Sequence, residues 1–330
     1  MLDTGSSVLW VPSSACDEKN CPGSSTSTLF DSSQSSSYIG DKNNRFFMDY
    51  GVGHCIGESG QDSVFIGVKE IEHQKFGVAN KISKDLLVDG VNGVFGLGPP
   101  VTTQVFNQNK EKWKTPLEQL FANKAIDRNM FSIYLDDIDN IEEFESANGQ
   151  LTLGDLPPRD SYSGDIQWAP LLGGNLLQYY WAIKSNGIKL DNEYISGDLI
   201  GIVDTGTTMI ILAPEYGNRV IESLKITEFD EEKRLYTVDC NKVRSLPTLT
   251  FMITDGVTLV LTPEQYTVPH WQTTLWQNND ARCPLYISTD SSDKFDFVFG
   301  QKFLEHYVTI YDVDNKQIGF APSVHNKASK

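Results

Sequence analysis

Short segments that alternate polar and apolar residues, separated by turn residues at close intervals, run through most of this 330-residue chain. Residues 45–50 and 61–66 have the character of strands on either side of a glycine-rich stretch at residues 51–57, which predicts a hairpin with residues 51–57 at its tip. The serine-rich residues 13–40 cannot form a core and predict loops that join short strands. The pattern as a whole predicts an all-β fold.

Helical signals are few. Thr115 and Glu118 form a capping-box pattern with Pro116 at the first helical position, which predicts a helix through Lys124. Residues 213–224 carry apolar positions near helical spacing, and residues 262–264 predict one short turn. A few short helices therefore accompany the strands.

One pattern occurs twice: an apolar pair, then Asp-Thr-Gly, then a hydroxyl residue. The apolar pair predicts a short buried strand, and the glycine predicts a turn in which a positive φ is tolerated. A single copy is a weak signal because Asp and Gly are ordinary turn residues. Two copies suggest two carboxylates that a duplicated fold brings together. The copies are Asp3-Thr4-Gly5-Ser6 and Asp204-Thr205-Gly206-Thr207.

A second pair of stretches supports duplication. Residues 89–98 are a glycine-punctuated apolar run, and residues 295–300 repeat its character. Gly96 follows Asp3 by 93 positions and Gly300 follows Asp204 by 96, so the two offsets nearly match. Each copy is too long for a solenoid repeat and is read as a lobe. We expect an N-terminal lobe at residues 1–156 and a C-terminal lobe at 157–330. The chain is expected to cross from one lobe to the other within residues 142–158.

The formal net charge is −17 and no dense Lys/Arg run occurs, which disfavours a nucleic-acid partner. The sequence contains no apolar run of about 18 residues, so no membrane-spanning helix is expected. Two local disulfides would leave one of the five cysteines unpaired, and we favour disulfides in an oxidising compartment over reduced thiols. A metal site is disfavoured because no Cys-x-x-Cys occurs and the histidines are scattered. The cysteines are Cys16, Cys21, Cys55, Cys240 and Cys283.

Taken together, these residues resemble the pepsin-like aspartic endopeptidases over essentially the whole chain. Residues 3–12 and 202–207 are similar to the two catalytic motifs of that family, and Tyr50-Gly51-Val52-Gly53 lies where the family has its flap tyrosine. Residues 93–97 and 297–300 resemble the family's hydrophobic-hydrophobic-Gly elements, and residues 310–321 resemble its closing strands. The resemblance implies a bilobal pepsin-like acid protease fold with a cleft between two lobes. It also implies the bridges Cys16–Cys21 and Cys240–Cys283.

The resemblance further implies the chemistry. Asp3 and Asp204 would share one proton and activate a water for attack on a peptide carbonyl. Tyr50, with its hydroxyl partnered by the Trp10 indole N–H, would close with Gly51 over the substrate. We expect extended polypeptide substrates with bulky apolar residues around the scissile bond, cleavage at acidic pH, a monomer, and a secreted or acidic-vesicle location. No metal or other cofactor is expected. The residues that would support the two aspartates are Thr4, Gly5, Ser6, Thr205, Gly206 and Thr207.

Three departures from the family stand out, and the last of them keeps an alternative function open. The family normally has about thirty residues before its first catalytic aspartate, after a signal peptide and prosegment, and only Met1 and Leu2 stand there in this chain. We therefore expect an N-terminally incomplete chain. The flap tip carries Val52, His54 and Cys55 in place of small polar residues. The alternative function is a catalytically inactive homologue that binds peptides or proteins. Separately, Asp3 and Asp204 could serve only as turn-capping residues.

Overall fold

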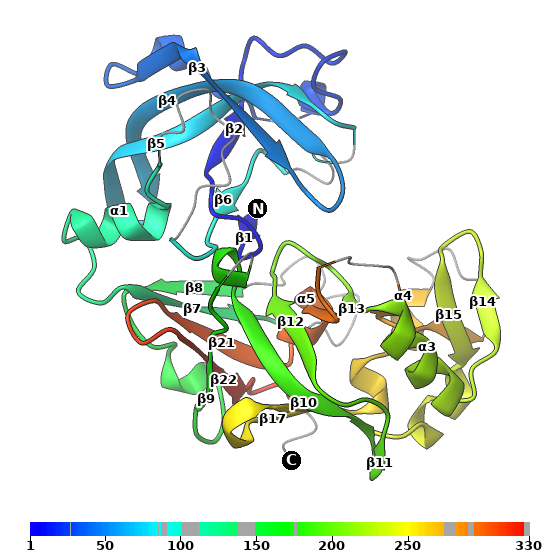
Figure 1. The fold of residues 1–330 in the computed structure, drawn as a ribbon. Helices are drawn as coiled ribbons and strands as arrows, with labels where there is room; N and C mark the ends of the chain where they lie inside the picture. Colours follow the sequence, from blue (N-terminus) through cyan, green and yellow to red (C-terminus); the bar gives the residue numbers. More distant parts are fainter. Residues whose placement is uncertain are drawn as a thin grey trace. The chain divides into compact units, whose positions relative to one another are not determined.

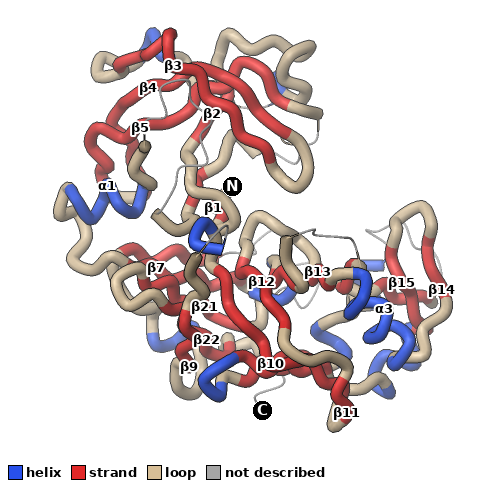
Figure 2. Tube along the Cα trace, in the orientation of Figure 1, coloured by secondary structure: helices blue, strands red, loops and turns tan. Residues whose placement is uncertain are grey.

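The computed structural model shows a mostly β protein (Figures 1 and 2). The chain folds into two compact units, which are described separately below. Unit 1 comprises Met1–Asn129 with Gln178–Tyr180, and unit 2 comprises Met130–Leu177 with Trp181–Lys330. The lobe boundary expected between residues 156 and 157 stays a prediction. The structure describes residues 1–26, 28–84, 86, 91–100, 112–137, 149–174, 177–273, 281–289 and 294–326.

Unit 1 contains a four-stranded sheet in the order β2-β5-β4-β3 and a two-stranded parallel pair, β1-β6. Figure 1 shows β3, β4 and β5 as long, curved neighbouring strands. The elements of the unit are β1 (Leu2–Asp3), β2 (Trp10–Pro12), η1 (Ser24–Thr26), η2 (Ser32–Gln34), β3 (Ile39–Asp49), β4 (His54–Ile66), β5 (Lys69–Ile82), β6 (Phe95–Gly96) and α1 (Pro116–Ala122).

The predicted hairpin is β3 and β4, but its tip is shorter than expected. Asp49 pairs with His54, so the turn is confined to Tyr50–Gly53, and residues 54–57 belong to β4. Gly57 serves close packing and not a turn, because a Cβ there would lie 2.0 Å from the carbonyl oxygen of Val78. The expected glycine-rich tip of residues 51–57 was therefore wrong at its C-terminal end.

The hydrophobic core of unit 1 includes buried side chains of β2 and of the β3–β4 hairpin. Trp10, Phe46, Met48 and Trp113 are all at least 97% buried and pack in one cluster. The helix predicted after Thr115 is α1, and its capping box is confirmed by the two reciprocal hydrogen bonds between Thr115 and Glu118. The helix ends at Ala122, slightly before the expected Lys124.

Unit 2 contains three sheets: an eight-stranded sheet, a three-stranded sheet and a five-stranded sheet. Its elements are β7 (Met130–Leu135), β8 (Gly149–Leu153), η3 (Arg159–Ser161), β9 (Gln167–Pro170), β10 (Ala182–Leu190), β11 (Glu193–Tyr194), β12 (Leu199–Val203), β13 (Ile210–Leu212), α3 (Pro214–Ser223), β14 (Glu228–Asp230), β15 (Leu235–Asp239), η5 (Cys240–Ser245), β16 (Leu249–Ile253), η6 (Thr254–Gly256), β17 (Thr258–Leu261), η7 (Pro263–Gln265), α4 (His270–Thr273), β18 (Arg282–Pro284), β19 (Ile287–Ser288), β20 (Phe297–Phe299), α5 (Gln301–Leu304), β21 (Tyr307–Asp312) and β22 (Gln317–Pro322). The short helix η4 (Leu177–Tyr179) begins in unit 2 and continues into the part of unit 1 at Gln178–Tyr180.

The eight-stranded sheet places β12 between β10 and β20, and the five-stranded sheet follows the order β8-β7-β21-β22-β9. β7 and β8 belong to unit 2 because β7 pairs with β21. Part of the expected crossing at residues 142–158 is therefore strand β8, and residues 142–148 lie outside the described residues. Aromatic rings fill the core of the unit, with Phe299 stacked on Phe303 at a centroid distance of 3.8 Å.

The other sequence predictions for unit 2 hold with small shifts. The helix expected at residues 213–224 is α3, and the turn expected at 262–264 is η7 with its own capping box. The closing strands expected at residues 310–321 are β21 and β22.

Both expected disulfides, Cys16–Cys21 and Cys240–Cys283, are present, and Cys55 is a buried free thiol. Among the described residues, no helix combines the length and hydropathy that crossing a bilayer requires.

Candidate active site

The first candidate carboxylate, Asp3, lies at the end of β1. This strand runs parallel to β6, with Leu2 opposite Phe95 and Asp3 opposite Gly96. The Asp3 side chain is 97% buried and accepts hydrogen bonds from the Gly5 N–H, at 2.9 Å, and from the Ser6 hydroxyl. A buried carboxylate is thus held at a strand end by two donors from its own turn.

The second candidate carboxylate, Asp204, has the same local arrangement in unit 2. It directly follows β12, which runs parallel to β20. One of its carboxylate oxygens accepts from the Gly206 N–H at 2.8 Å, and the other accepts from the Thr207 hydroxyl at 2.6 Å. The repeated Asp-Thr-Gly-hydroxyl pattern therefore builds the same hydrogen-bonded turn twice.

In each unit a glycine lies directly against the segment that follows the aspartate: Gly96 in β6, and Gly300 immediately after β20. A Cβ on Gly96 would lie 2.3 Å from the backbone nitrogen of Val8, and a Cβ on Gly300 would lie 2.2 Å from the carbonyl oxygen of Met209. Real Cβ atoms essentially never come closer than 3.0 Å to such atoms, so no larger residue fits without movement of the backbone. The same steric constraint thus explains why both matched positions in the sequence are glycine.

The glycines of the Asp-Thr-Gly motifs have a different role from the one expected. Neither Gly5 nor Gly206 has a positive φ. Their contribution in the structure is an N–H directed at the carboxylate two residues earlier. The expected turn is present at both positions, but it does not use the positive φ that glycine would tolerate.

Hydrogen bonds also tie each turn to the segment that follows its paired strand. In unit 1 the Gly98 N–H donates to the Ser6 carbonyl at 2.7 Å, and in unit 2 the Gln301 N–H donates to the Thr207 carbonyl at 2.8 Å. The Gln301 side chain adds a further bond of 2.9 Å to the Thr205 carbonyl. Sequence reasoning missed Gln301, and its only signal is its place immediately after Gly300.

Tyr50 and Trp10 meet in unit 1 as expected. The Trp10 indole Nε1–H donates to the Tyr50 hydroxyl at 2.6 Å, and Trp10 is fully buried. Burial raises the pKa of Tyr50 well above its usual range, and the nearby Cys55 and Asp3 act in the same direction. Tyr50 therefore stays a neutral hydroxyl, while Gly51 is exposed beside it in the hairpin turn.

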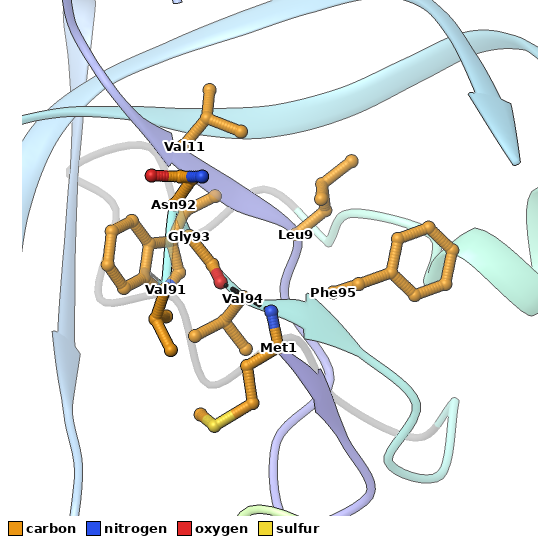
Figure 3. Close-up of a pocket in the computed structure, with 9 residues that line it drawn as sticks. Met1, Leu9, Val11, Val91, Asn92, Gly93, Val94 and Phe95 are labelled. Carbon is orange, nitrogen blue, oxygen red and sulfur yellow. Dashed lines mark hydrogen bonds between the residues drawn. The ribbon is translucent and has the colours of Figure 1, made fainter. Parts of the chain in front are cut away.

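A pocket of about 380 Å³ lies in unit 1 beside Met1 and β6 (Figure 3). It is lined by β2, by β6 and its preceding residues, and by Met1, whose amino group donates to the Gly93 carbonyl at 2.9 Å. Burial lowers the pKa of this amino group, with Asp3 opposing the effect. The lining contains no carboxylate, so the pocket offers no acid–base chemistry of its own.

One group of side chains in the described part of the chain has the spacing of metal ligands: Cys240, His270 and Cys283. The two sulfur atoms are bonded to each other in a disulfide. Only the His270 imidazole remains as a donor, so the group as it stands does not make a metal site.

Comparison with known proteins shows the family of the chain that carries these two aspartate turns, which are called half-sites below. The family model for eukaryotic aspartyl proteases matches residues 1–323. The chain belongs to this family. Gastricsin from Cavia porcellus is 30% identical over 97% of this chain and 75% of its own length, and cathepsin E from Rattus norvegicus is 30% identical over 98% and 76%. The crystal structure of an aspartic proteinase from Irpex lacteus matches with a TM-score of 0.83 and 26% identity, covering 99% of this chain and 91% of that one.

These matches confirm the sequence-based resemblance and the mostly β, bilobal pepsin-like fold. Members of the eukaryotic aspartyl protease family are aspartic endopeptidases. In this family member, each unit carries one Asp-Thr-Gly turn with its carboxylate held by a backbone N–H and a hydroxyl.

Proposed function

We propose that the protein is an aspartic endopeptidase in which Asp3 and Asp204 form one catalytic pair. The observation that carries the proposal is the double occurrence of the same half-site: a carboxylate at a strand end, two local donors, and a glycine pressed against the turn. Membership of the aspartyl protease family supports the pairing of the two half-sites.

In the proposed mechanism the pair shares one proton, because two adjacent carboxylates cannot both ionise cheaply. Aspartic proteases are the standard example of this effect. The ionised aspartate removes a proton from a bound water, and the water oxygen attacks the peptide carbonyl carbon. The protonated aspartate donates to the carbonyl oxygen as negative charge develops there. The aspartate that took the proton from water then gives it to the amide nitrogen, the C–N bond breaks as the oxyanion collapses to a carboxylic acid, and the pair again holds one proton.

The surrounding residues have positioning roles in this proposal. In each aspartate the hydroxyl of Ser6 or Thr207 donates to one carboxylate oxygen, and the N–H of Gly5 or Gly206 donates to the other. Thr4 and Thr205, which are at least 97% buried, would interlock the two turns. These bonds fix the rotamer of each aspartate before substrate arrives.

The β3–β4 hairpin is the proposed flap. Tyr50, held by Trp10, and Gly51 in the adjoining turn would close over an extended polypeptide and exclude water. The exposed Val52 at the tip adds apolar surface, consistent with a preference for bulky apolar residues around the scissile bond.

We further propose that the protein acts as a monomer at acidic pH, in a secreted or acidic-vesicle location. The two disulfides fit an oxidising compartment. The alternative, an inactive peptide-binding homologue, has no specific support beyond the flap-tip residues, because the carboxylate and both donors are intact in each half-site.

The test is hydrolysis of an unfolded protein substrate between pH 3 and 5 and its inhibition by a statine-type compound. Asp204→Ala should abolish cleavage, whereas Asp160→Asn, at an exposed site on η3, should cleave at the wild-type rate. Peptide binding without turnover by the wild-type protein would favour the inactive homologue. Unchanged cleavage by Asp204→Ala would refute the proposed pair.

A further inference from the structure

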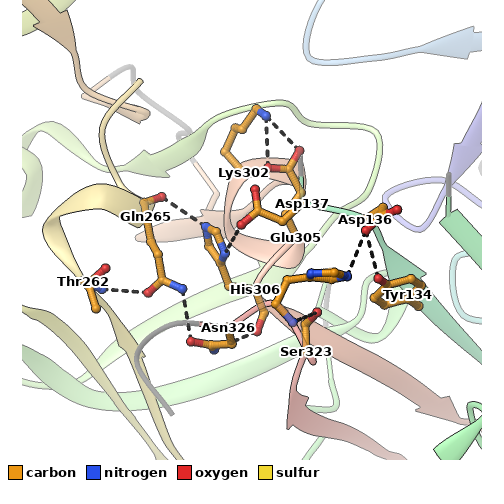
Figure 4. A network of polar contacts seen from close by, with 11 residues as sticks. Tyr134, Asp136, Asp137, Thr262, Gln265, Lys302, Glu305, His306, Ser323 and Asn326 are labelled. Atoms are coloured by element: carbon orange, nitrogen blue, oxygen red, sulfur yellow. Dashed lines mark hydrogen bonds and ion pairs between the residues drawn. The ribbon is translucent and has the colours of Figure 1, made fainter. Parts of the chain in front are cut away.

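Unit 2 holds a buried cluster of ionisable groups that the proposed mechanism does not use (Figure 4). Lys302 and Glu305 form an ion pair at 2.8 Å, with side chains 16% and 14% exposed. The Asp137 carboxylate, which follows β7, lies 3.7 Å from Nδ1 of His306, and these side chains are 19% and 6% exposed. Four ionisable side chains from two distant parts of the sequence thus meet in the interior.

The surroundings of His306 suit a protonated ring. Its Nε2 lies 3.3 Å from the carbonyl oxygen of Gln265, and its Nδ1 faces a carboxylate oxygen of Asp137. Both neighbours are acceptors when Asp137 is ionised. The imidazolium can donate from Nε2 to the Gln265 carbonyl while its charge attracts the Asp137 carboxylate at ion-pair distance, and a neutral ring has no such attraction.

The charges around His306 point the same way. Lys302 is paired with Glu305, and the Asp137 carboxylate lies at ion-pair distance from the His306 ring, so the negative charge of Asp137 favours the protonated ring. Tyr286, whose ring lies 5.0 Å from Lys302 Nζ, adds no charge because burial raises the pKa of its hydroxyl and keeps it protonated. Just outside the set, the half-exposed His325 pairs with Asp136 at 3.2 Å.

His306 is also connected to the turn that carries Asp204. It follows Glu305 at the end of α5, and its backbone N–H donates to the Phe303 carbonyl. At its other end, α5 donates from the backbone of Gln301 and Lys302 to the carbonyls of Thr207 and Thr208. A tie between Asp137 and the end of α5 therefore holds the element that supports the Asp204 turn.

We propose that His306 is a pH-responsive positioning residue, which in its protonated form joins Asp137 to the end of α5 and so fixes the turn that carries Asp204. The inference rests on the proposed function for its meaning in catalysis. The structural tie itself stands independently of it.

The pH dependence has a definite sign. If the folded protein holds the His306 proton more tightly than the unfolded chain, stability is full below the ordinary pKa of histidine, about 6.5, and falls as pH rises above it. Burial also raises the pKa of Glu305, so ionising this carboxyl costs more in the folded state and likewise favours low pH. Both groups therefore stabilise unit 2 in acid.

The test measures thermal unfolding from pH 5 to pH 8 in full-length protein. All samples carry Asp204→Asn, which makes the comparison independent of activity and prevents self-digestion. His306→Gln cannot take up the proton, so it should lose about tenfold in the folding equilibrium constant at pH 5 and change little at pH 8, a difference of about 4 °C in Tm. His270→Gln, at an exposed histidine, should keep the parent pH dependence.

Asp137→Asn gives a second and opposite signature. An amide N–H can donate to the neutral ring, so this variant should be less stable than the parent at pH 5 and at least as stable at pH 8. The plots of Tm against pH for Asp137→Asn and for the parent should therefore cross, which a loss of packing alone would not produce. It also keeps the proposal testable if His306→Gln fails to fold.

Hydrogen–deuterium exchange tests the positioning. After correction for intrinsic rates, protection of residues 204–208 and 301–305 should fall between pH 5.5 and 7.5 in the parent, and His306→Gln should show the low protection at both values. Stability and protection that follow the parent at every pH in His306→Gln, or fall equally at every pH, would overturn the proposal. Absence of proteolysis in the wild-type protein would count against the proposed function and not against this tie.

Discussion

Replacing Gly96 by alanine tests whether the strand beside the first half-site positions Asp3. The new Cβ would lie 2.3 Å from the Val8 nitrogen and 2.5 Å from the Ser7 carbonyl carbon, which are backbone atoms of the loop after the Asp-Thr-Gly turn. Ordinary carbon contacts need about 3.5–4.0 Å, so this loop must move by roughly 1 Å. Overpacking of this kind costs about 1–3 kcal/mol of stability.

The expected result is a Tm lower by about 5 °C and a kcat/KM lower by about 100-fold, because a misplacement of about 1 Å at a reacting group has an effect of that size. Scanning calorimetry and hydrolysis of a fluorogenic peptide at pH 4 measure the two quantities. Gly197→Ala is the matched control, since a Cβ there meets nothing within 4 Å, and it should behave as wild type. A Gly96→Ala variant with wild-type kcat/KM would refute the steric reasoning.

Three further predictions follow from the packing. Cys240→Ser should lower the free energy of unfolding by about 4 kcal/mol and Cys16→Ser by about 2 kcal/mol. The reason is that the Cys240–Cys283 bridge joins residues 43 positions apart, whereas the Cys16–Cys21 bridge joins residues 5 apart. A larger loss for Cys16→Ser in urea unfolding would contradict this. Burial raises the pKa of the Cys55 thiol, so a thiol-disulfide reagent at pH 8 should label no cysteine in the native protein and one after unfolding. Trp10→Phe removes the donor to the Tyr50 hydroxyl and should cost about 1–2 kcal/mol and lower kcat, and a fully active variant would argue against a role for this bond.

The features that the sequence predicted well are those set by short-range chemistry. The Asp3 and Asp204 turns close hydrogen bonds over two or three residues, and the Thr115 capping box closes them over three. Such patterns are visible as consecutive letters because each bond joins near neighbours. The pairing of Trp10 with Tyr50 came from the family resemblance, since 40 positions separate the two residues.

Features set by tertiary packing were missed or misplaced. Gly57 was assigned to a turn because glycine is a common turn residue, yet the fold uses it where Val78 approaches within a strand. Asp137 and His306 show no local pattern at all, and they meet only because β7 pairs with β21. A glycine or a lone histidine has several structural uses, and only the folded neighbours select one of them.

The most direct test of the central claim, that Asp3 and Asp204 act as one catalytic unit, is a double-mutant comparison of kcat/KM at pH 4. Asp3→Asn and Asp204→Asn should each lower kcat/KM by at least about 1,000-fold, and the double variant should be no slower than the slower single variant, because groups that act together are strongly non-additive. Circular dichroism should show all three variants folded. Losses that multiply in the double variant, or one single variant with wild-type activity, would contradict the account.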